Sequence, residues 1–251
     1  MQALVQLYRW PVILVRVLLQ AFHLSDLQES YLCQGQRLST HFSGIGTVEQ
    51  GLTYLKAELV KHGLDCKLEP VACTDYDKHS IKVLLRTSHG CVFGNILDRS
   101  KLKPHTFRNI SSTSKRIKAM LRASIEPKAS CHAHKKKCCV PKVDVDMSGS
   151  PCTAHSRIGK RLGTLDPNFQ VLLTWARNQI KNGTPVLVHE NVIGFPFSLI
   201  ETIWFIPLSD SSLPVVVVRL PCLFIECCFP QFGTFFDSIN FCSCTTFFHL
   251  A

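Results

Sequence analysis

The sequence has no long uncharged apolar run. Residues 1–24 are apolar, but Arg9 and Arg16 interrupt them, so no run reaches the roughly 18 residues of a membrane-spanning helix. A secretory signal peptide is the alternative interpretation of this stretch, although no convincing small-residue cleavage site precedes Ser25. We therefore predict an amphipathic or poorly ordered leader over residues 1–36 and no membrane partner.

Disulfide spacing and internal repeats are also absent. The 13 cysteines are odd in number and show none of the spacings of a small disulfide scaffold. A reducing compartment fits this cysteine usage best, so we predict an intracellular location, nuclear if the source is eukaryotic. With 46% hydrophobic and 18% charged residues in a chain of 251, a sizeable core can form, which excludes wholesale disorder.

Acidic residues are almost missing from one segment. Residues 99–142 contain 13 Lys and Arg but one acid, Glu126, for a net charge of +12, whereas the whole chain has a formal charge of +10. Such a basic segment favours binding to a polyanion or to an anionic membrane surface, and the alternative is a solvated, disordered insert. We assign it no firm secondary structure and expect it to lie outside the core.

Strands and helices alternate elsewhere in residues 37–196. Short apolar runs predict strands at 38–42, 68–73, 90–93, 143–147 and 185–189, and apolar residues at helical spacing predict helices from about 47 to 62, 78 to 85 and 167 to 182. Thr47 and Gln50 form a capping pattern, and Asp166 precedes a proline at the start of the third helix. This alternation predicts an α/β fold with a Rossmann-like, doubly wound, mostly parallel sheet, whose ligands bind at the carboxyl ends of the strands.

Short motifs fall where those strands end. They are Phe42-Ser43-Gly44-Ile45-Gly46, Asp75-Tyr76-Asp77-Lys78, Gly94-Asn95-Ile96, Ser150-Pro151-Cys152 and Glu190-Asn191-Val192. A glycine turn before a helix can bring backbone N–H groups to an anionic ligand, and a thiol at a strand end can act as a nucleophile. Each motif, taken alone, also has a purely structural explanation: a tight connection, an exposed loop acid or a buried apolar cysteine.

In this order, the motifs resemble those of the cytosine-5 DNA methyltransferases over residues 37–196. The resemblance implies S-adenosylmethionine as the cofactor, DNA as the partner and methyl transfer to carbon 5 of cytosine through a covalent Cys152 intermediate, with Glu190 stabilising the charge that develops on the base. It also implies a cofactor site, made of Phe42, Ser43, Gly44, Gly46, Asp75, Tyr76, Asn95 and Ile96.

The chain departs from the family pattern in three places. Asn95 stands where the family usually has an acid, Thr153 follows the catalytic Cys in place of Gln, and no Gln-x-Arg-x-Arg motif follows Pro196. We therefore expect a fold that is incomplete at its carboxyl end, with an apolar tail of uncertain structure over residues 197–251. The alternatives are an inactive or truncated fragment that binds the cofactor or nucleic acid, and an RNA cytosine-5 methyltransferase.

A cluster of cysteine and histidine residues lies late in the basic segment. It consists of Cys131, His132, His134, Cys138 and Cys139. These are zinc ligands by type, but their spacing matches no standard zinc finger, and the adjacent run 135–137 of three lysines repels a cation. The sequence therefore favours no metal, with zinc as the second interpretation.

Overall fold

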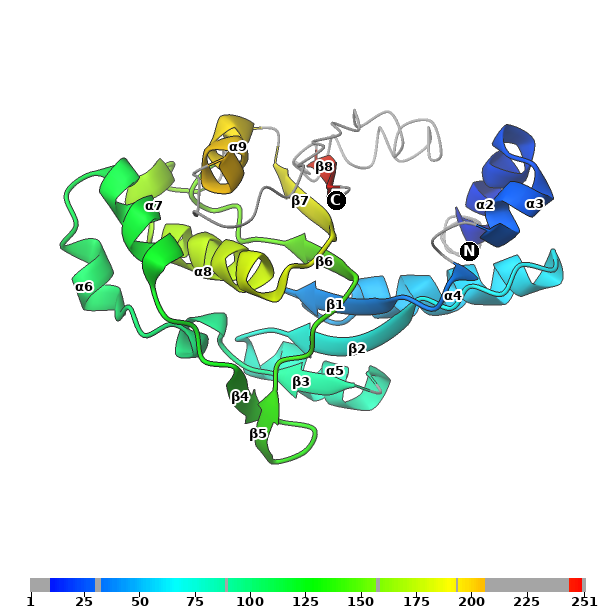
Figure 1. Cartoon of the computed structure of the whole chain (residues 1–251), viewed down its shortest axis with the longest axis horizontal. Helices are drawn as coiled ribbons and strands as arrows, with labels where there is room; N and C mark the ends of the chain where they lie inside the picture. Colours follow the sequence, from blue (N-terminus) through cyan, green and yellow to red (C-terminus); the bar gives the residue numbers. More distant parts are fainter. Residues whose placement is uncertain are drawn as a thin grey trace.

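The computed structural model describes residues 10–29, 33–88, 90–156, 159–192, 194–205 and 244–249. Within these residues one sheet of eight strands forms, in the order β5-β4-β3-β2-β1-β6-β7-β8 (Figure 1). The strands are β1 Arg37–His41, β2 Glu69–Thr74, β3 Cys91–Phe93, β4 Lys128–Cys131, β5 Lys136–Cys139, β6 Val145–Gly149, β7 Val186–Val192 and β8 Cys244–His249. Five neighbouring strands, β3, β2, β1, β6 and β7, run parallel, and β4, β5 and β8 pair antiparallel with their neighbours.

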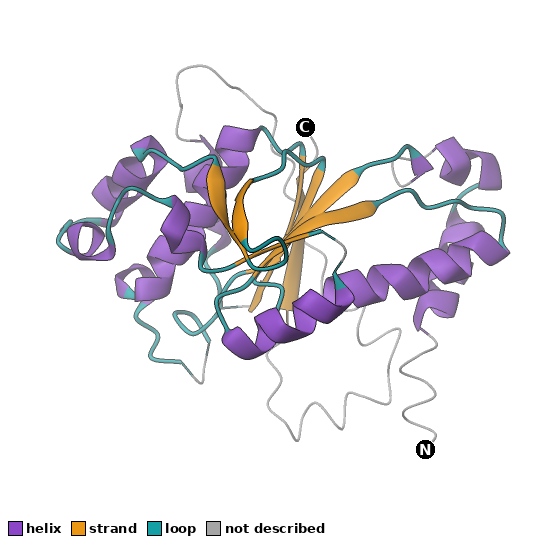
Figure 2. Ribbon diagram, turned by 90° about the horizontal axis from the view of Figure 1, so that it is seen from below, coloured by secondary structure: helices purple, strands orange, loops and turns teal. Residues whose placement is uncertain are grey.

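Helices cover both faces of the sheet (Figure 2). They are α2 Trp10–Ala21, α3 Leu24–Glu29, α4 Thr47–Lys61, α5 Lys78–Thr87, α6 Pro104–Arg108, α7 Thr113–Arg122, α8 Pro167–Asn182 and α9 Phe197–Phe205, with short 3-10 turns at Ile96–Arg99 and Gly163–Leu165. Because side chains alternate along a strand, Leu38 and Val145 pack with α4 on one face, whereas Asp146 meets Trp175 of α8 on the other.

The chain winds in two directions from β1. It passes through β2 to β3 on one side and through β6 to β7 on the other. The gap between β1 and β6 is therefore a topological switch point, where an open α/β sheet leaves a crevice at the carboxyl ends of its strands. The doubly wound, mostly parallel α/β fold predicted from the sequence is confirmed.

Most predicted elements agree with the structure to within a few residues, but the predicted cap of α4 is wrong. Gly46 precedes the helix in the left-handed region, with φ 79°, and no side chain among the described residues caps the helix start. Gln50 donates instead to the Ile45 carbonyl. The predicted cap of α8 is confirmed, because the Asp166 carboxylate accepts from the Asn168 N–H at 2.8 Å.

The expectation that residues 99–142 lie outside the core is wrong. The segment forms α6, α7 and the β4–β5 hairpin, and four of its apolar side chains are buried in the largest core cluster: Phe107, Ile117, Met120 and Leu121. Arg116 is buried as well, where it donates to the carbonyls of Ile110, Thr164 and Arg108. Eleven of the 13 basic residues nevertheless remain exposed, all except Arg99 and Arg116.

The two ends of the chain are described only in part. Residues 10–29 of the predicted leader form helices, and Val15 is fully buried in the cluster under α4. In the predicted tail, α9 and β8 are regular, while residues 206–243 lie outside the described part. No helix in the described residues is both long and apolar enough to cross a membrane.

Candidate active site at the carboxyl edge of the sheet

The loops that follow β1, β2 and β3 are joined by hydrogen bonds. The Gly44 N–H donates to Asp75 Oδ2 at 2.7 Å, and the Asp77 N–H donates to Asp75 Oδ1 at 2.8 Å. The backbone N–H of Asp75 donates in turn to the Phe93 carbonyl at 3.2 Å. The predicted glycine turn and the predicted acid therefore belong to one continuous surface, because a single carboxylate bridges them.

A buried polar cluster supports the glycine turn from below. Thr40 and Ser43 hydrogen-bond through their hydroxyls at 2.7 Å, and Ser43 also accepts from the Thr74 N–H at 3.2 Å. The Thr40 hydroxyl donates to Glu49 Oε1. The other oxygen, Glu49 Oε2, is buried and has no hydrogen-bond partner in the described residues, which is a costly arrangement for a carboxylate unless a ligand satisfies it.

The remaining residues predicted to bind a cofactor differ in exposure. Tyr76 is 72% exposed, so its ring is open to a planar partner. Asn95 is exposed and its side chain caps the 3-10 turn by accepting from the Leu97 N–H. Phe42 has a left-handed backbone, with φ 60°. The Ile96 side chain is 3% exposed and lies in the core, so it supports the loop from inside.

Of the two predicted catalytic residues, Glu190 lies on β7, and Cys152 lies in the loop that follows its parallel neighbour β6. Register pairs Glu190 on β7 with Gly149, the last residue of β6, and Cys152 follows three residues later. A β-carbon at position 149 would lie 3.0 Å from Glu190 Oε2, so glycine makes room for the carboxylate. Cys152 is half-buried against the main core cluster.

Buried side chains hold the backbone of the cysteine loop. Asn191 donates to both the carbonyl and the hydroxyl of Ser150, at 3.1 and 2.9 Å. His189 Nε2 lies 2.9 Å from the same hydroxyl, and its ring stacks on Trp175 with centroids 4.9 Å apart. Burial lowers the pKa of His189 to about 4, so the ring is neutral near pH 7.

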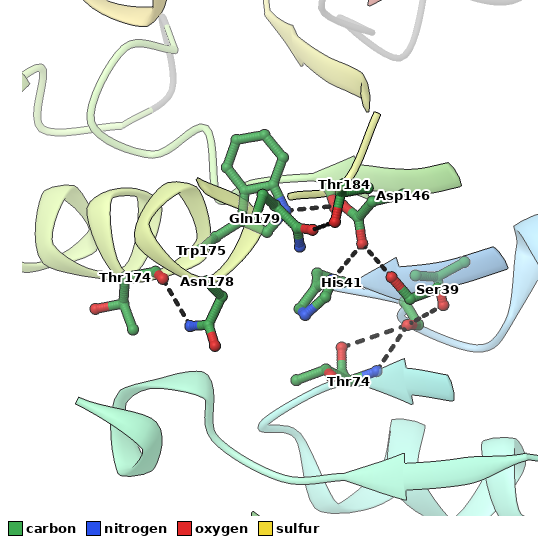
Figure 3. Close-up of polar contacts among 12 residues, drawn as sticks. Ser39, His41, Thr74, Asp146, Thr174, Trp175, Asn178, Gln179 and Thr184 are labelled. Atoms are coloured by element: carbon green, nitrogen blue, oxygen red, sulfur yellow. Dashed lines mark hydrogen bonds and ion pairs between the residues drawn. The ribbon is translucent and has the colours of Figure 1, made fainter. Parts of the chain in front are cut away.

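An ionic cluster lies beneath the switch point (Figure 3). Asp146 is fully buried and binds His41 Nδ1 at 2.7 Å and Trp175 Nε1 at 2.8 Å, together with the hydroxyls of Ser39 and Ser148. Burial alone would raise the pKa of Asp146, but the charge and hydrogen bond of His41 and the hydroxyl groups bring it below the ordinary value. The carboxylate is therefore ionised and ties β1, β6 and α8 together.

Arg99 extends this cluster toward β2. It is 2% exposed, donates to Thr74 Oγ1 at 3.0 Å and lies 3.4 Å from His41 Nε2. Burial lowers the pKa of Arg99 to about 10, against the opposing effect of Asp146. One signal in the sequence could have pointed to this cluster, because Asp146 is a charged residue inside a predicted buried strand. Nothing in the sequence distinguishes Arg99 from its basic neighbours.

Among the comparisons with known proteins, only the comparison with solved structures found similar proteins. No family model and no curated protein matches the chain. A candidate DNA modification methyltransferase encoded within an E. coli prophage is similar over 85% of this chain, at 12% identity and a TM-score of 0.43. The S. pombe Dnmt2 methyltransferase is similar over 86%, at 14% identity and a TM-score of 0.41. The chain spans about half the length of these two structures, 46% and 50% respectively.

Proposed function

We propose that the chain carries the catalytic and cofactor-binding half of an S-adenosylmethionine-dependent methyltransferase that methylates carbon 5 of cytosine in nucleic acid. One observation carries the proposal. The register of β6 and β7 brings Glu190 opposite Gly149, three residues before Cys152, on the same carboxyl edge as the joined loops of Gly44 and Asp75. A thiol and a carboxylate on neighbouring strand ends suit covalent catalysis on a planar base.

The cofactor fits groups that the structure leaves available. No side chain in the described part of the chain caps the start of α4, so the first N–H groups of this helix suit the carboxylate of an amino acid. The unpartnered buried oxygen of Glu49 suits the adjacent ammonium. Asp75, whose oxygens can each accept a further hydrogen bond, would hold the ribose, and the exposed ring of Tyr76 would stack on the adenine. When bound, the cofactor supplies an electrophilic methyl group.

The chain's own residues would activate the base. The Cys152 thiolate adds to carbon 6 of cytosine, which makes carbon 5 nucleophilic. Glu190, hydrogen-bonded at the ring nitrogen 3 edge, would stabilise the negative charge that this addition develops. After carbon 5 is methylated, loss of its proton restores the ring double bond and releases the thiolate. The base must leave a duplex to reach such a site.

Methyl transfer from labelled S-adenosylmethionine to cytosine-containing DNA and RNA tests the proposal. We expect Cys152→Ala to lower turnover by roughly a thousandfold or more, because the covalent step is lost. Cys139→Ala is the matched control, since Cys139 is exposed and ends β5, an edge strand that four other strands separate from β6. Equal turnover in the Cys152→Ala variant would refute the covalent role, and cofactor binding without turnover in any form would mark an inactive protein.

Glu190→Gln separates the role of the carboxylate from that of the thiol. This variant should still form a covalent complex with a 5-fluorocytosine substrate, more slowly, whereas Cys152→Ala should form none. A trapped complex at the unchanged rate in the Glu190→Gln variant would remove Glu190 from the mechanism.

The exposed basic residues between 101 and 142 are proposed to contact nucleic-acid phosphates. Three of them, Lys135, Lys136 and Lys137, lie together at the β4–β5 turn and the start of β5. Replacing all three by Gln should reduce the slope of log affinity against log salt by about 2 to 3, since each phosphate contact contributes about 0.9. Lys61→Gln on α4 is the control. An unchanged slope in the triple variant would place the contact surface elsewhere.

A further inference from the structure

Four metal-ligand side chains meet at one edge of the sheet, away from the strand ends described above. Cys91 is on β3, Cys131 ends β4, His134 is in the hairpin turn and Cys138 is on β5. Their four ligand atoms all lie within 4.8 Å of one another. Three strands and one hairpin turn thus bring three thiols and one imidazole to a common point.

The three nitrogen-to-sulfur distances match those of a tetrahedral metal centre. His134 Nδ1 lies 3.3 Å from the sulfur of Cys131, 3.5 Å from that of Cys138 and 3.6 Å from that of Cys91. With Zn–S near 2.3 Å and Zn–N near 2.0 to 2.1 Å, a tetrahedron separates sulfur from nitrogen by about 3.6 Å. All three separations are within about 0.3 Å of that value.

Hydrogen bonding alone does not account for this arrangement. An imidazole Nδ1 is either a donor with one hydrogen or an acceptor with one lone pair, so it can make one good hydrogen bond. Here three sulfurs surround the same nitrogen. A cation at the centre would use the lone pair of the nitrogen and one lone pair of each thiolate, and so would satisfy all four groups at once.

We propose that Cys91, Cys131, His134 and Cys138 bind one zinc ion as a closed structural site. Three soft sulfurs and one imidazole are the ligands of structural zinc, and four protein ligands leave no open position for catalysis. Binding would release the thiol protons to solvent and give a complex of net charge −1. The three lysines at 135–137 are exposed and would neutralise this anionic complex. Their charge, which would repel a free cation, therefore favours the complete zinc complex.

The weak pairing between β3 and β4 indicates that a metal ion would stabilise the attachment of the hairpin to the sheet. β3 pairs with β4 through a single residue pair, Phe93 with Cys131. The apolar cluster there is small, with Ala72, Phe93 and Cys131 as its buried members. One ligand comes from β3 and three come from the hairpin, so the ion would fasten the hairpin to the sheet edge where burial contributes little.

Metal analysis of the full-length chain, purified without chelator, tests the site. We expect about one zinc ion per chain by mass spectrometry of the metal content. Cobalt(II) in place of zinc should show the absorption of a tetrahedral site together with sulfur-to-cobalt charge transfer. Zinc content near zero after growth with zinc, or cobalt bound without charge transfer, would overturn the proposal.

Paired variants assign the ligands. Cys138→Ser and His134→Ala should lose most of the zinc, whereas the neighbouring Cys139→Ser and His132→Ala should retain it. Cobalt titration of the Cys138→Ser variant gives a second readout, because reduced charge-transfer intensity reports one missing thiolate even where folding is weakened. Equal zinc loss in the Cys139→Ser control, or full retention in both ligand variants, would show that the ion binds elsewhere.

Discussion

The centre of the sheet and its β4–β5 edge are stabilised by different chemistry. At the centre, β1, β6 and β7 lie between α4 and α8, and a fully buried carboxylate, Asp146, joins strand to strand and strand to helix. At the edge, two four-residue strands carry exposed lysines and a small apolar cluster. The comparison indicates that the centre combines hydrophobic burial under its covering helices with a buried ionic cluster, whereas the edge buries little apolar surface and is where a metal cross-link would contribute most.

Asp146→Ala tests the centre and should give the largest loss. It leaves the buried Arg99 without a nearby carboxylate and removes the acceptor of His41 and Trp175. We expect the free energy of unfolding to fall by about 3–5 kcal/mol, as when one partner of a buried charge pair is removed.

Denaturant titration followed by circular dichroism measures this loss. Glu126→Gln is the control, because its contact with Lys101 is exposed and is worth about 1 kcal/mol or less. A loss in Asp146→Ala as small as that of the control would mean that the buried ionic cluster does not stabilise the centre.

Lowering the pH should destabilise the centre of the sheet through the protonation of His189. The pKa of this histidine is lowered to about 4 in the folded chain by burial, against about 6.5 when unfolded. The unfolded state therefore binds a proton first, and stability that is complete above pH 6.5 declines as the pH falls to about 4, by about 3 kcal/mol in all.

The pH dependence of unfolding in wild type and His189→Gln isolates this effect. The variant should lose the His189 contribution to the slope between pH 6.5 and 4, while groups that titrate lower, Asp146 among them, continue to act below that range. Parallel curves for the two proteins over pH 4 to 6.5 would contradict the assignment.

Removal of the metal should affect the edge alone. After treatment with a strong chelator, backbone amides of residues 128–139 should exchange hydrogen more than about tenfold faster, because the hairpin then depends on its own weak pairing. Amides of β6 and β7 should keep their protection. Loss of protection in both regions would make the edge and the centre one cooperative unit, and no change in either would contradict a structural metal.

The sequence predicted the parallel strands and the helices α4, α5 and α8, because their apolar periodicity is uninterrupted. It missed α7, although Ile117, Met120 and Leu121 have helical spacing, since four basic residues among them dominated the composition. The cap of α4 was misassigned because Gly46 adopts a left-handed backbone that leaves Thr47 inside the helix.

The candidate sites differ in how much of each could be predicted from the sequence. The motifs at strand ends are local, so their order was enough to predict one shared edge. Cys91 is 40 residues from Cys131, and only the pairing of β3 with β4 brings them together. The fold likewise brings together the distant residues Asp146, His41 and Arg99, and no spacing in the sequence predicts that cluster.

The buried anchors of residues 99–142 have a further consequence for recognition. With Phe107, Ile117, Met120 and Arg116 fixed in the interior, the exposed lysines and arginines stand on a rigid support. A flexible charged tail loses conformational entropy when it binds a polyanion. Basic residues held by a folded segment have already lost that entropy during folding. Their affinity should therefore depend on how well the spacing of the charges fits the phosphates, and a helical substrate should be preferred over a flexible polyanion of equal charge.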